Sequence, residues 1–300
     1  MAQKKRISIY RKDLKPGNTN DNQQEFWLYS LSEYDSKGNI TEQIIYDNNE
    51  TIIERVVRKY DNNGLLIHEQ FFVDNNEPSD EKTYERDENG LLTAEIKHYL
   101  DGSYDKTTYH YDSQNRIIKT VTTDDEGETE QEMINEYSGE FLVKSLTTDP
   151  DGDVIYLDEF IYNEAENTVE HKKINNENGE ESHILTHYNS SSRKISETFF
   201  DEDGDVISKV YYEEDEKGNV VKVWEDGDNN HVTEIKYDEK GNAVLQEEMD
   251  EEGNIINSVK REFDEDGNII FSNVFIDGQG IRLPQHYEMK FEYTVEDENE

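Results

Sequence analysis

Residues 237–268 read YDEKGNAVLQEEMDEEGNIINSVKREFDEDGN and contain one full period of a repeat. The pattern of an aromatic residue, Asp, two variable residues, Gly and Asn begins at Tyr237 and begins again at Phe263. A second acidic turn signal, Asp250–Asn254, lies midway between them. Gly adopts positive φ angles at no steric cost, and Asp or Asn side chains bond their own backbone, so each of these sites predicts a tight turn. The stretch therefore predicts a β-hairpin.

The same signal recurs along almost the whole chain. Its aromatic anchors are Tyr34, Tyr60, Tyr84, Tyr111, Tyr137, Tyr162, Tyr188, Tyr212, Tyr237, Phe263 and Tyr287, at intervals of 24 to 27 residues. Midway turns include Asp47–Asn49, Asp101-Gly102, Asp124–Gly127, Asp201–Gly204 and Asp277-Gly278. Turn signals that come about every 12–13 residues are typical of an all-β chain.

The segments between turns show the alternation of a strand with one apolar face. Between Leu92 and Leu100, one parity is mostly apolar and the other is mostly polar. We therefore predict an all-β fold, a repetitive antiparallel β-hairpin meander of about 11 units of about 25 residues. Neighbouring strands twist by roughly 20–25°, so we expect the meander to coil into an elongated spiral sheet or a partial shell.

The chain ends differ from the repeats. Residues 1–24 are expected to form a basic N-terminal segment and a polar loop, with a first strand over residues 5–12. Residues 25–295 form a single repeat domain in this interpretation, and residues 296–300 form a disordered acidic tail. The basic segment could contact an acidic part of a neighbouring copy, so self-assembly stays open.

The Tyr-Asp-x-x-Gly-Asn pattern resembles the YD repeat of bacterial RHS proteins, insecticidal toxin shells and animal teneurins. The resemblance covers roughly residues 25–295 and implies repeated hairpins in a spiralling β-strip that can close into a hollow shell. The chain is much shorter than a typical RHS shell. Only Asp149-Pro150-Asp151-Gly152 matches the family's cleavage signature, and we interpret that match as a turn.

The composition excludes several classes of function. The 300 residues include 72 Asp or Glu and 30 Lys or Arg, for a net charge of −42, and there is no Cys. The acidity disfavours direct binding to nucleic acid or to an anionic membrane surface. No apolar run is long enough for a membrane helix and no apolar signal core follows the start, so we expect a cytoplasmic protein.

We predict no catalytic, cofactor-binding or metal-binding residue. His183 and His187 are four apart on a predicted strand, where same-face positions lie about 13–14 Å apart, too far for one ion. Asp149–Asp153 and Asp201–Asp205 resemble calcium loops in composition, but Gly stands at their fourth position and not the sixth. Weak divalent screening at such turns stays open. The anchor tyrosines are interpreted as a structural ladder.

Two functions remain on sequence grounds. The first is a non-enzymatic repeat scaffold or protein-interaction module, in a bacterial secretion or defence assembly. The second is an acidic inhibitor, an immunity-type protein or nucleic-acid mimic that covers a basic partner. Both imply a protein partner with a basic surface, recruited by acidic turns that we expect at both edges of the sheet.

Overall fold

The computed structural model describes residues 3–14, 25–73, 77–227, 230–278 and 283–297, and the regular structure in these ranges is entirely β-strand. The 22 strands are β1 (Gln3–Asp13), β2 (Trp27–Tyr34), β3 (Ile40–Tyr46), β4 (Ile52–Tyr60), β5 (Leu66–Val73), β6 (Glu77–Arg86), β7 (Leu92–His98), β8 (Tyr104–Tyr111), β9 (Ile117–Thr123), β10 (Thr129–Ser138), β11 (Phe141–Thr148), β12 (Val154–Asn163), β13 (Thr168–Asn175), β14 (Glu180–Tyr188), β15 (Lys194–Phe200), β16 (Val206–Glu214), β17 (Val220–Asp226), β18 (Val232–Tyr237), β19 (Ala243–Met249), β20 (Ile255–Phe263), β21 (Ile269–Ile276) and β22 (Gln285–Asp297). The predicted all-β hairpin meander is confirmed.

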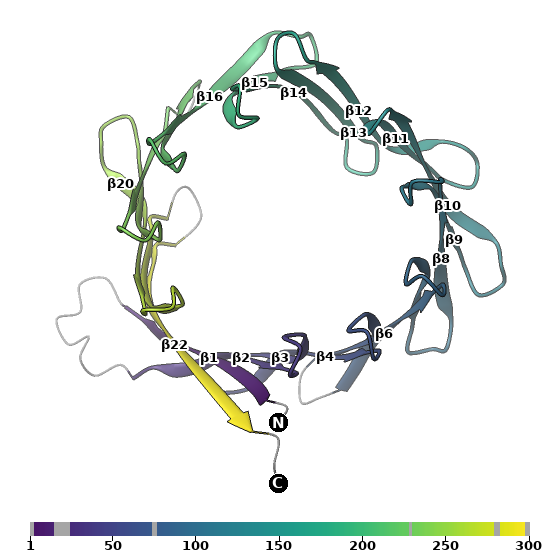
Figure 1. The fold of residues 1–300 in the computed structure, drawn as a ribbon, viewed down its shortest axis with the longest axis horizontal. Helices are drawn as coiled ribbons and strands as arrows, with labels where there is room; N and C mark the ends of the chain where they lie inside the picture. The colour runs from purple at the N-terminus through teal and green to yellow at the C-terminus, as the bar shows by residue number, and fades with distance from the viewer. Residues whose placement is uncertain (1–2, 15–24, 74–76, 228–229, 279–282, 298–300) are drawn as a thin grey trace.

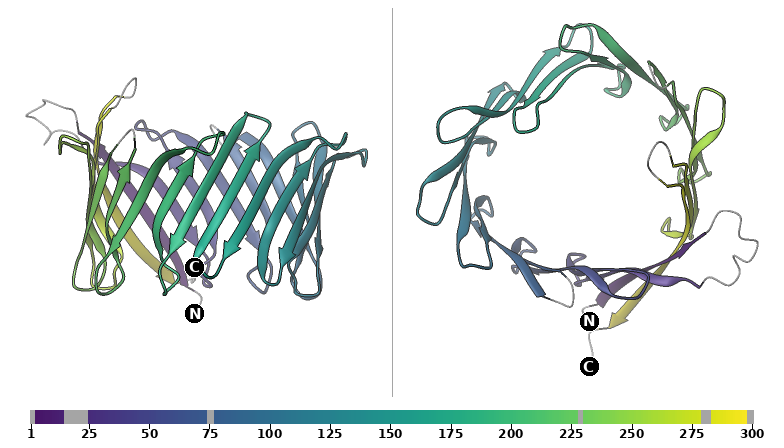
Figure 2. Two further views of the ribbon diagram at one scale, coloured as in Figure 1. Left: turned by 90° about the horizontal axis from the view of Figure 1, so that it is seen from above. Right: turned by 180° about the vertical axis from the view of Figure 1, so that it is seen from behind.

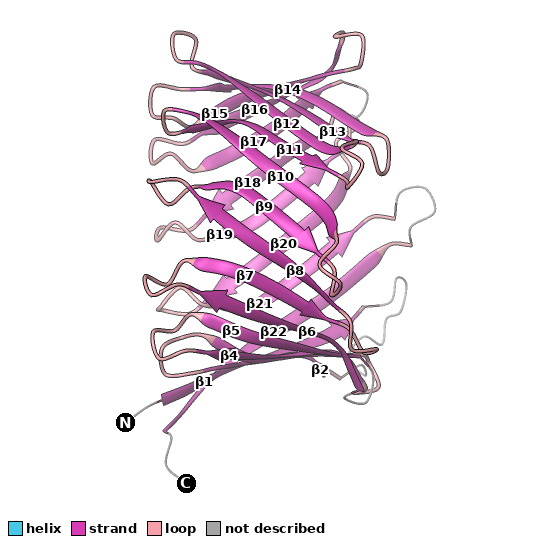
Figure 3. Ribbon diagram, turned by 90° about the vertical axis from the view of Figure 1, so that its right-hand side faces the viewer, coloured by secondary structure: helices cyan, strands magenta, loops and turns pink. Residues whose placement is uncertain are grey.

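The sheet closes on itself as a barrel (Figure 1). Each strand pairs antiparallel with the next, and β1 also pairs with β22 from Gln3 opposite Asp297 to Asp13 opposite Tyr287. The expected spiral sheet or partial shell would have left two edges open. That part of the expectation is wrong, because β1 and β22 pair with each other. The twist is accommodated instead by tilting the strands against the barrel axis (Figures 2 and 3), as closure of a sheet requires.

Both chain ends contribute to the wall. Residues 3–13 of the basic N-terminal segment form β1, whereas residues 1–2 and 15–24 lie outside the described residues. Strand β22 continues to Asp297, which is inside the segment expected to be a disordered tail. Residues 298–300 lie outside the described residues.

The wall is a single layer around a wide ring. A compact protein of 35.2 kDa would expose about 13,000 Å², but this chain exposes 19307 Å². No large side chain in the described ranges is less than 2% exposed. Twenty-two strands about 4.8 Å apart and tilted by about 40° enclose a ring about 44 Å across. Side chains fill only much smaller barrels, and no described element crosses the ring in Figure 1.

An Asp closes most of the repeat turns, and in several of them an Asn side chain bonds that Asp. Asp238 accepts hydrogen bonds at Oδ1 from the amides of Lys240 and Asn242, both at 2.9 Å, and at Oδ2 from the Asn242 side chain, also at 2.9 Å. The Asn242 bonds hold the pKa of Asp238 below its usual value. Gly241 and Gly267 have φ angles of 90° and 84°, as the turn prediction requires.

A β-bulge follows most of these turns. Tyr237 lies opposite Ala243 and Lys236 lies opposite Leu245, so Val244 is an extra residue in β19. Such register shifts occur in 16 of the 22 pairings between described strands. A bulge bends its strand and increases the local twist, so its repetition helps to curve the wall.

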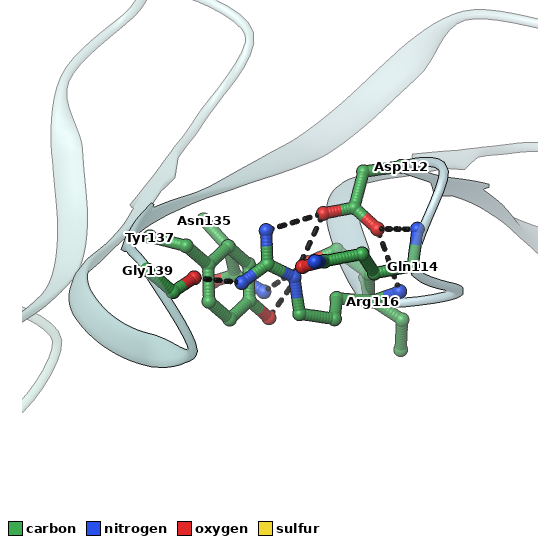
Figure 4. A network of polar contacts seen from close by, with 7 residues as sticks. Asp112, Gln114, Arg116, Asn135, Tyr137 and Gly139 are labelled. Atoms are coloured by element: carbon green, nitrogen blue, oxygen red, sulfur yellow. Dashed lines mark hydrogen bonds and ion pairs between the residues drawn. The ribbon is translucent and has the colours of Figure 1, made fainter.

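Tyrosine hydroxyls continue the pairing where the backbone ladder stops. Strands β17 and β18 pair only as far as Lys222 opposite Glu234, and beyond that point the Tyr237 hydroxyl donates to the Val220 carbonyl at 2.9 Å. Equivalent bonds of 2.7 to 3.1 Å are made by the anchors Tyr60, Tyr111, Tyr137 and Tyr162, and on β22 by Tyr293 in place of the predicted anchor Tyr287. Figure 4 shows Tyr137 of this set. These contacts support the interpretation of the anchors as a structural ladder.

Two anchors bond a carboxylate instead. The hydroxyls of Tyr84 and Tyr212 donate to Glu69 and Glu197, each at 2.5 Å. Burial and this hydrogen bond raise the pKa of both tyrosines. Both anchors therefore remain neutral donors near neutral pH.

The turn geometry predicts the effect of Gly241 substitutions. No atom lies within 4 Å of the position that a Cβ would take, so the cost of a side chain is conformational. We expect Gly241→Val to lower the free energy of unfolding by about 1–3 kcal/mol, measured by urea titration. Gly241→Asn is the control and should cost much less, because Asn115 already adopts φ 61° in a related turn. Equal losses would contradict this account.

The hydroxyl bond of Tyr237 predicts a second stability difference. Tyr237→Phe leaves the half-buried Val220 carbonyl without its donor, and we expect a loss of about 1 kcal/mol in the free energy of unfolding. Tyr188→Phe is the matched control, since that anchor's hydroxyl makes no hydrogen bond to any described residue. Equal stability of Tyr237→Phe and wild type would show that the hydroxyl does not support the wall.

Candidate functional site

The barrel presents two rims with different chemistry. The start of β1 and the end of β22 lie at the same end of the barrel, where Gln3 is opposite Asp297, and we name this end the terminal rim (Figure 2). It consists of turns 35–39, 61–65, 87–91, 112–116, 139–140, 164–167, 189–193, 215–219, 238–242 and 264–268. The opposite end, the distal rim, consists of turns 47–51, 99–103, 124–128, 149–153, 176–179, 201–205 and 250–254, with residues 14, 25–26, 227, 230–231, 277–278 and 283–284 of its longer connections.

Basic side chains connect neighbouring turns at the terminal rim. Lys37 and Lys240 donate through Nζ to the carbonyls of Asn62 and Glu265 at 2.5 and 2.8 Å. Arg116 bonds Asp112 within its own turn and the Gly139 carbonyl in the next turn, while its guanidinium lies 4.2 Å from the ring centroid of Tyr137 (Figure 4). Arg193 bonds Glu214 at 3.2 Å. Four of the five cations of this rim thus contact other groups of the wall.

The charge of the two rims differs. The ten turns of the terminal rim contain 15 acidic and five basic residues. The described part of the distal rim contains 20 acidic residues and no Lys or Arg. Both rims carry net negative charge, as the sequence predicted, but only the described part of the distal rim has no Lys or Arg to offset it.

Few contacts among the described residues join neighbouring distal turns. An added Cβ at Gly102, Gly127, Gly152, Gly179, Gly204 or Gly253 would meet no atom within 4 Å, although Gly38, Gly139 and Gly241 of the terminal rim are equally open. At the terminal rim, the guanidinium of Arg193 lies against Gly218 of the next turn, and the Lys37 side chain lies near Gly64. At the distal rim, the Asn230 side chain donates to Glu251 of the next turn at 2.5 Å.

The two calcium-like segments form ordinary distal turns. Asp149 Oδ1 accepts hydrogen bonds from the amides of Asp151 and Asp153, and Asp201 does the same for Asp203 and Asp205. The amide of Gly152 also donates to the Asp149 carbonyl at 3.1 Å. The Asp-Pro-Asp-Gly match thus lies in a hairpin turn. The described residues contain no cluster of three metal-ligating side chains.

The histidines pair with polar groups on adjacent strands. His183 lies 2.8 Å from Glu170 and stacks on Phe200, while the Nδ1 atom of His187 is buried without a hydrogen bond. His68, His171 and His231 each pair with a carboxylate at 2.8 to 2.9 Å. Sequence reasoning missed these pairs, since they depend on strand register. The structure does not place His183 and His187 at a common site.

Two surface grooves are open and mixed in charge. A groove of about 710 Å³ near the distal rim is lined by residues including Lys172, Glu181, His183, Phe200 and Asp203. Another, of about 610 Å³, lies over β19–β22 and includes Gln246, Glu248, Arg261 and Phe291. Neither groove gathers groups of a single chemical type. No helix long and apolar enough to cross a membrane occurs among the described residues.

Comparison with known proteins gives distant structural similarity only. No protein-family model matches the chain, and no curated protein matches it. A porin-like protein from Bacteroides uniformis ATCC 8492 is 9% identical over 97% of this chain and 96% of that one, with a TM-score of 0.31. TcdB2-TccC3-TEV is 11% identical over 97% of this chain, with a TM-score of 0.29, and the match spans 20% of its length.

Proposed function

We propose that this protein is a non-enzymatic barrel scaffold that binds a basic protein partner through its distal rim. The observation that carries the proposal is the distribution of charge: 20 acidic residues and no Lys or Arg in the described part of the distal rim. Dense surface charge of one sign attracts an oppositely charged partner and speeds association. At the terminal rim, Lys37, Arg116, Arg193 and Lys240 contact the neighbouring hairpin, so these cations serve the stability of the ring.

The pairing of the wall's polar side chains supports a scaffold role. The carboxylates that contact His68 and His171 lie on neighbouring strands, as cross-strand ladder contacts do. Tyrosine hydroxyls bond backbone carbonyls at the ends of strand pairs. These groups stabilise the sheet, and a binding role therefore falls to the turns.

Charges on both faces of the wall support a barrel that works in water. On β4, Arg55 contacts Glu42 at 2.6 Å and Arg58 contacts Glu69 at 2.7 Å. Arg55 and Arg58 are three residues apart on a regular stretch of strand, so the two ion pairs lie on opposite faces. A barrel in a membrane needs an apolar band on its outer face. Ion pairs near the middle of a strand on both faces therefore argue against insertion of this barrel into a membrane.

Regular spacing favours a second candidate, an acidic inhibitor that imitates nucleic acid. Successive distal turns are two strands apart, or about 12.5 Å along the rim when the strands tilt by about 40°. Evenly spaced carboxylate clusters could cover the phosphate-binding surface of a nuclease or DNA-binding protein. A partner that DNA displaces competitively would favour the inhibitor, whereas a partner that DNA leaves bound would favour the scaffold.

Neutralising each rim separately tests the proposal. The distal variant carries Asp125→Asn, Glu126→Gln, Glu202→Gln, Asp203→Asn, Glu251→Gln and Glu252→Gln, and it leaves the turn-closing Asp124, Asp201 and Asp250 in place. The terminal variant, its matched control, carries Glu88→Gln, Glu164→Gln, Glu166→Gln, Glu216→Gln, Glu239→Gln and Glu265→Gln. Both variants remove six charges.

The probe is a fluorescent decalysine peptide, titrated by anisotropy at several salt concentrations. Six exposed charges at a few tenths of a kcal/mol each predict about tenfold weaker binding by the distal variant. The salt dependence should fall as well. The terminal variant should change affinity much less. Equal losses from both variants would refute a distal binding surface, and no loss from either would leave the acidity with a role in solubility alone.

A further inference from the structure

Strand β1 alone closes the barrel. It lies between β22 and β2, and β1–β22 is the only pairing in the described sheet between strands that are not consecutive in sequence (Figure 1). All 21 other pairings join a strand to its successor along the chain. Without β1, the edges of β2 and β22 would each present unpaired amides and carbonyls, which are templates for another strand.

The sequence of β1 differs from the rest of the wall. It contains Lys4, Lys5, Arg6, Arg11 and Lys12 against the single acid Asp13, in a chain that is otherwise strongly acidic. Its neighbour β22 contains four acidic residues and one Lys. Charge complementarity therefore selects a basic strand for this position.

Cation contacts hold β1 to both neighbours. Arg6 pairs with Glu33 of β2 at 2.6 Å, and Lys12 lies 3.8 Å from Glu288 of β22. The Arg11 guanidinium lies 4.1 Å from the ring centroid of Tyr287, and Lys5 Nζ lies 5.4 Å from that of Tyr293. The Ser8 side chain is buried at the centre of β1. These contacts depend on side chains and register, not on the covalent connection of β1 to its own barrel.

We propose that β1 is an exchangeable strand, and that it also completes the barrel of a second copy of this chain. An identical copy supplies an identical basic strand, so the contacts to Glu33, Glu288 and Tyr287 are the same in either arrangement. Exchange of a terminal element between identical chains is a low-cost route to oligomers. Screening of the ion pairs by salt weakens the hold on β1 and speeds its exchange.

The absence of Cys from the chain allows a direct test. Ser8 lies opposite Glu292 in the β1–β22 pairing, so Ser8→Cys and Glu292→Cys place thiols within reach of a disulfide. Full-length chains that carry one substitution each are mixed under mild oxidation. Exchange predicts a mixed disulfide dimer of the two variants, resolved on non-reducing gels and identified by peptide mass. Its formation should be severalfold faster at 1 M than at 0.05 M NaCl.

Two controls make the result decisive. The double variant in one chain should form an internal disulfide, which shows that the barrel folds and that the pair is well placed. A mixture of Leu146→Cys and Leu157→Cys chains, which place thiols opposite each other on β11 and β12, should not crosslink because a five-residue turn joins these strands. An internal disulfide in the double variant without any mixed dimer would overturn the proposal. Mixed dimers from both mixtures at equal rates would overturn it too.

Discussion

The pairing of β1 with β22 is the constraint on which the ring depends. Each hairpin can form from residues close in sequence, whereas this pairing joins residues almost 300 positions apart. The entropy of closing so long a loop must be offset by the β1–β22 pairing, which we call the seam. The seam has 11 opposed residue pairs, and cation contacts hold β1 to both of its neighbours. Closure also removes the two open edges that an antiparallel sheet would otherwise expose to self-association.

Local chemistry made the repeat predictable. In most turns an Asp accepts the turn's own hydrogen bonds and a Gly adopts its positive φ, so the spacing of these residues predicts the hairpins and their number. The positive φ of Gly241 and Gly267 followed from the same reasoning. The sequence did not predict histidine pairs such as His183 with Glu170, because these pairs depend on which strands are adjacent and in what register.

Closure was not predictable for a physical reason. Alternating polarity identifies the faces of a strand but does not identify the edges that meet, and β1 lacks the turn signal that marks the other strands. Its basic charge was a usable signal, since the acidic β22 is its natural neighbour. The difference between the rims was also present in the sequence. Lys37, Arg116, Arg193, Lys217 and Lys240 all lie in turns of one alternating set. Because alternate turns of an antiparallel meander lie at opposite ends, these residues all belong to one rim.

The position of the seam has a consequence for the order of events during synthesis. Strand β1 leaves the ribosome first, yet its partner β22 begins only at Gln285. At roughly 5–20 residues per second, about 15 to 60 s separate the two. During that interval hairpins can accumulate one by one on the growing strip, as repeats with nearest-neighbour contacts do. One edge of β1 stays open throughout, and its positive charge keeps other basic strands of nascent copies away until the acidic partner strand emerges.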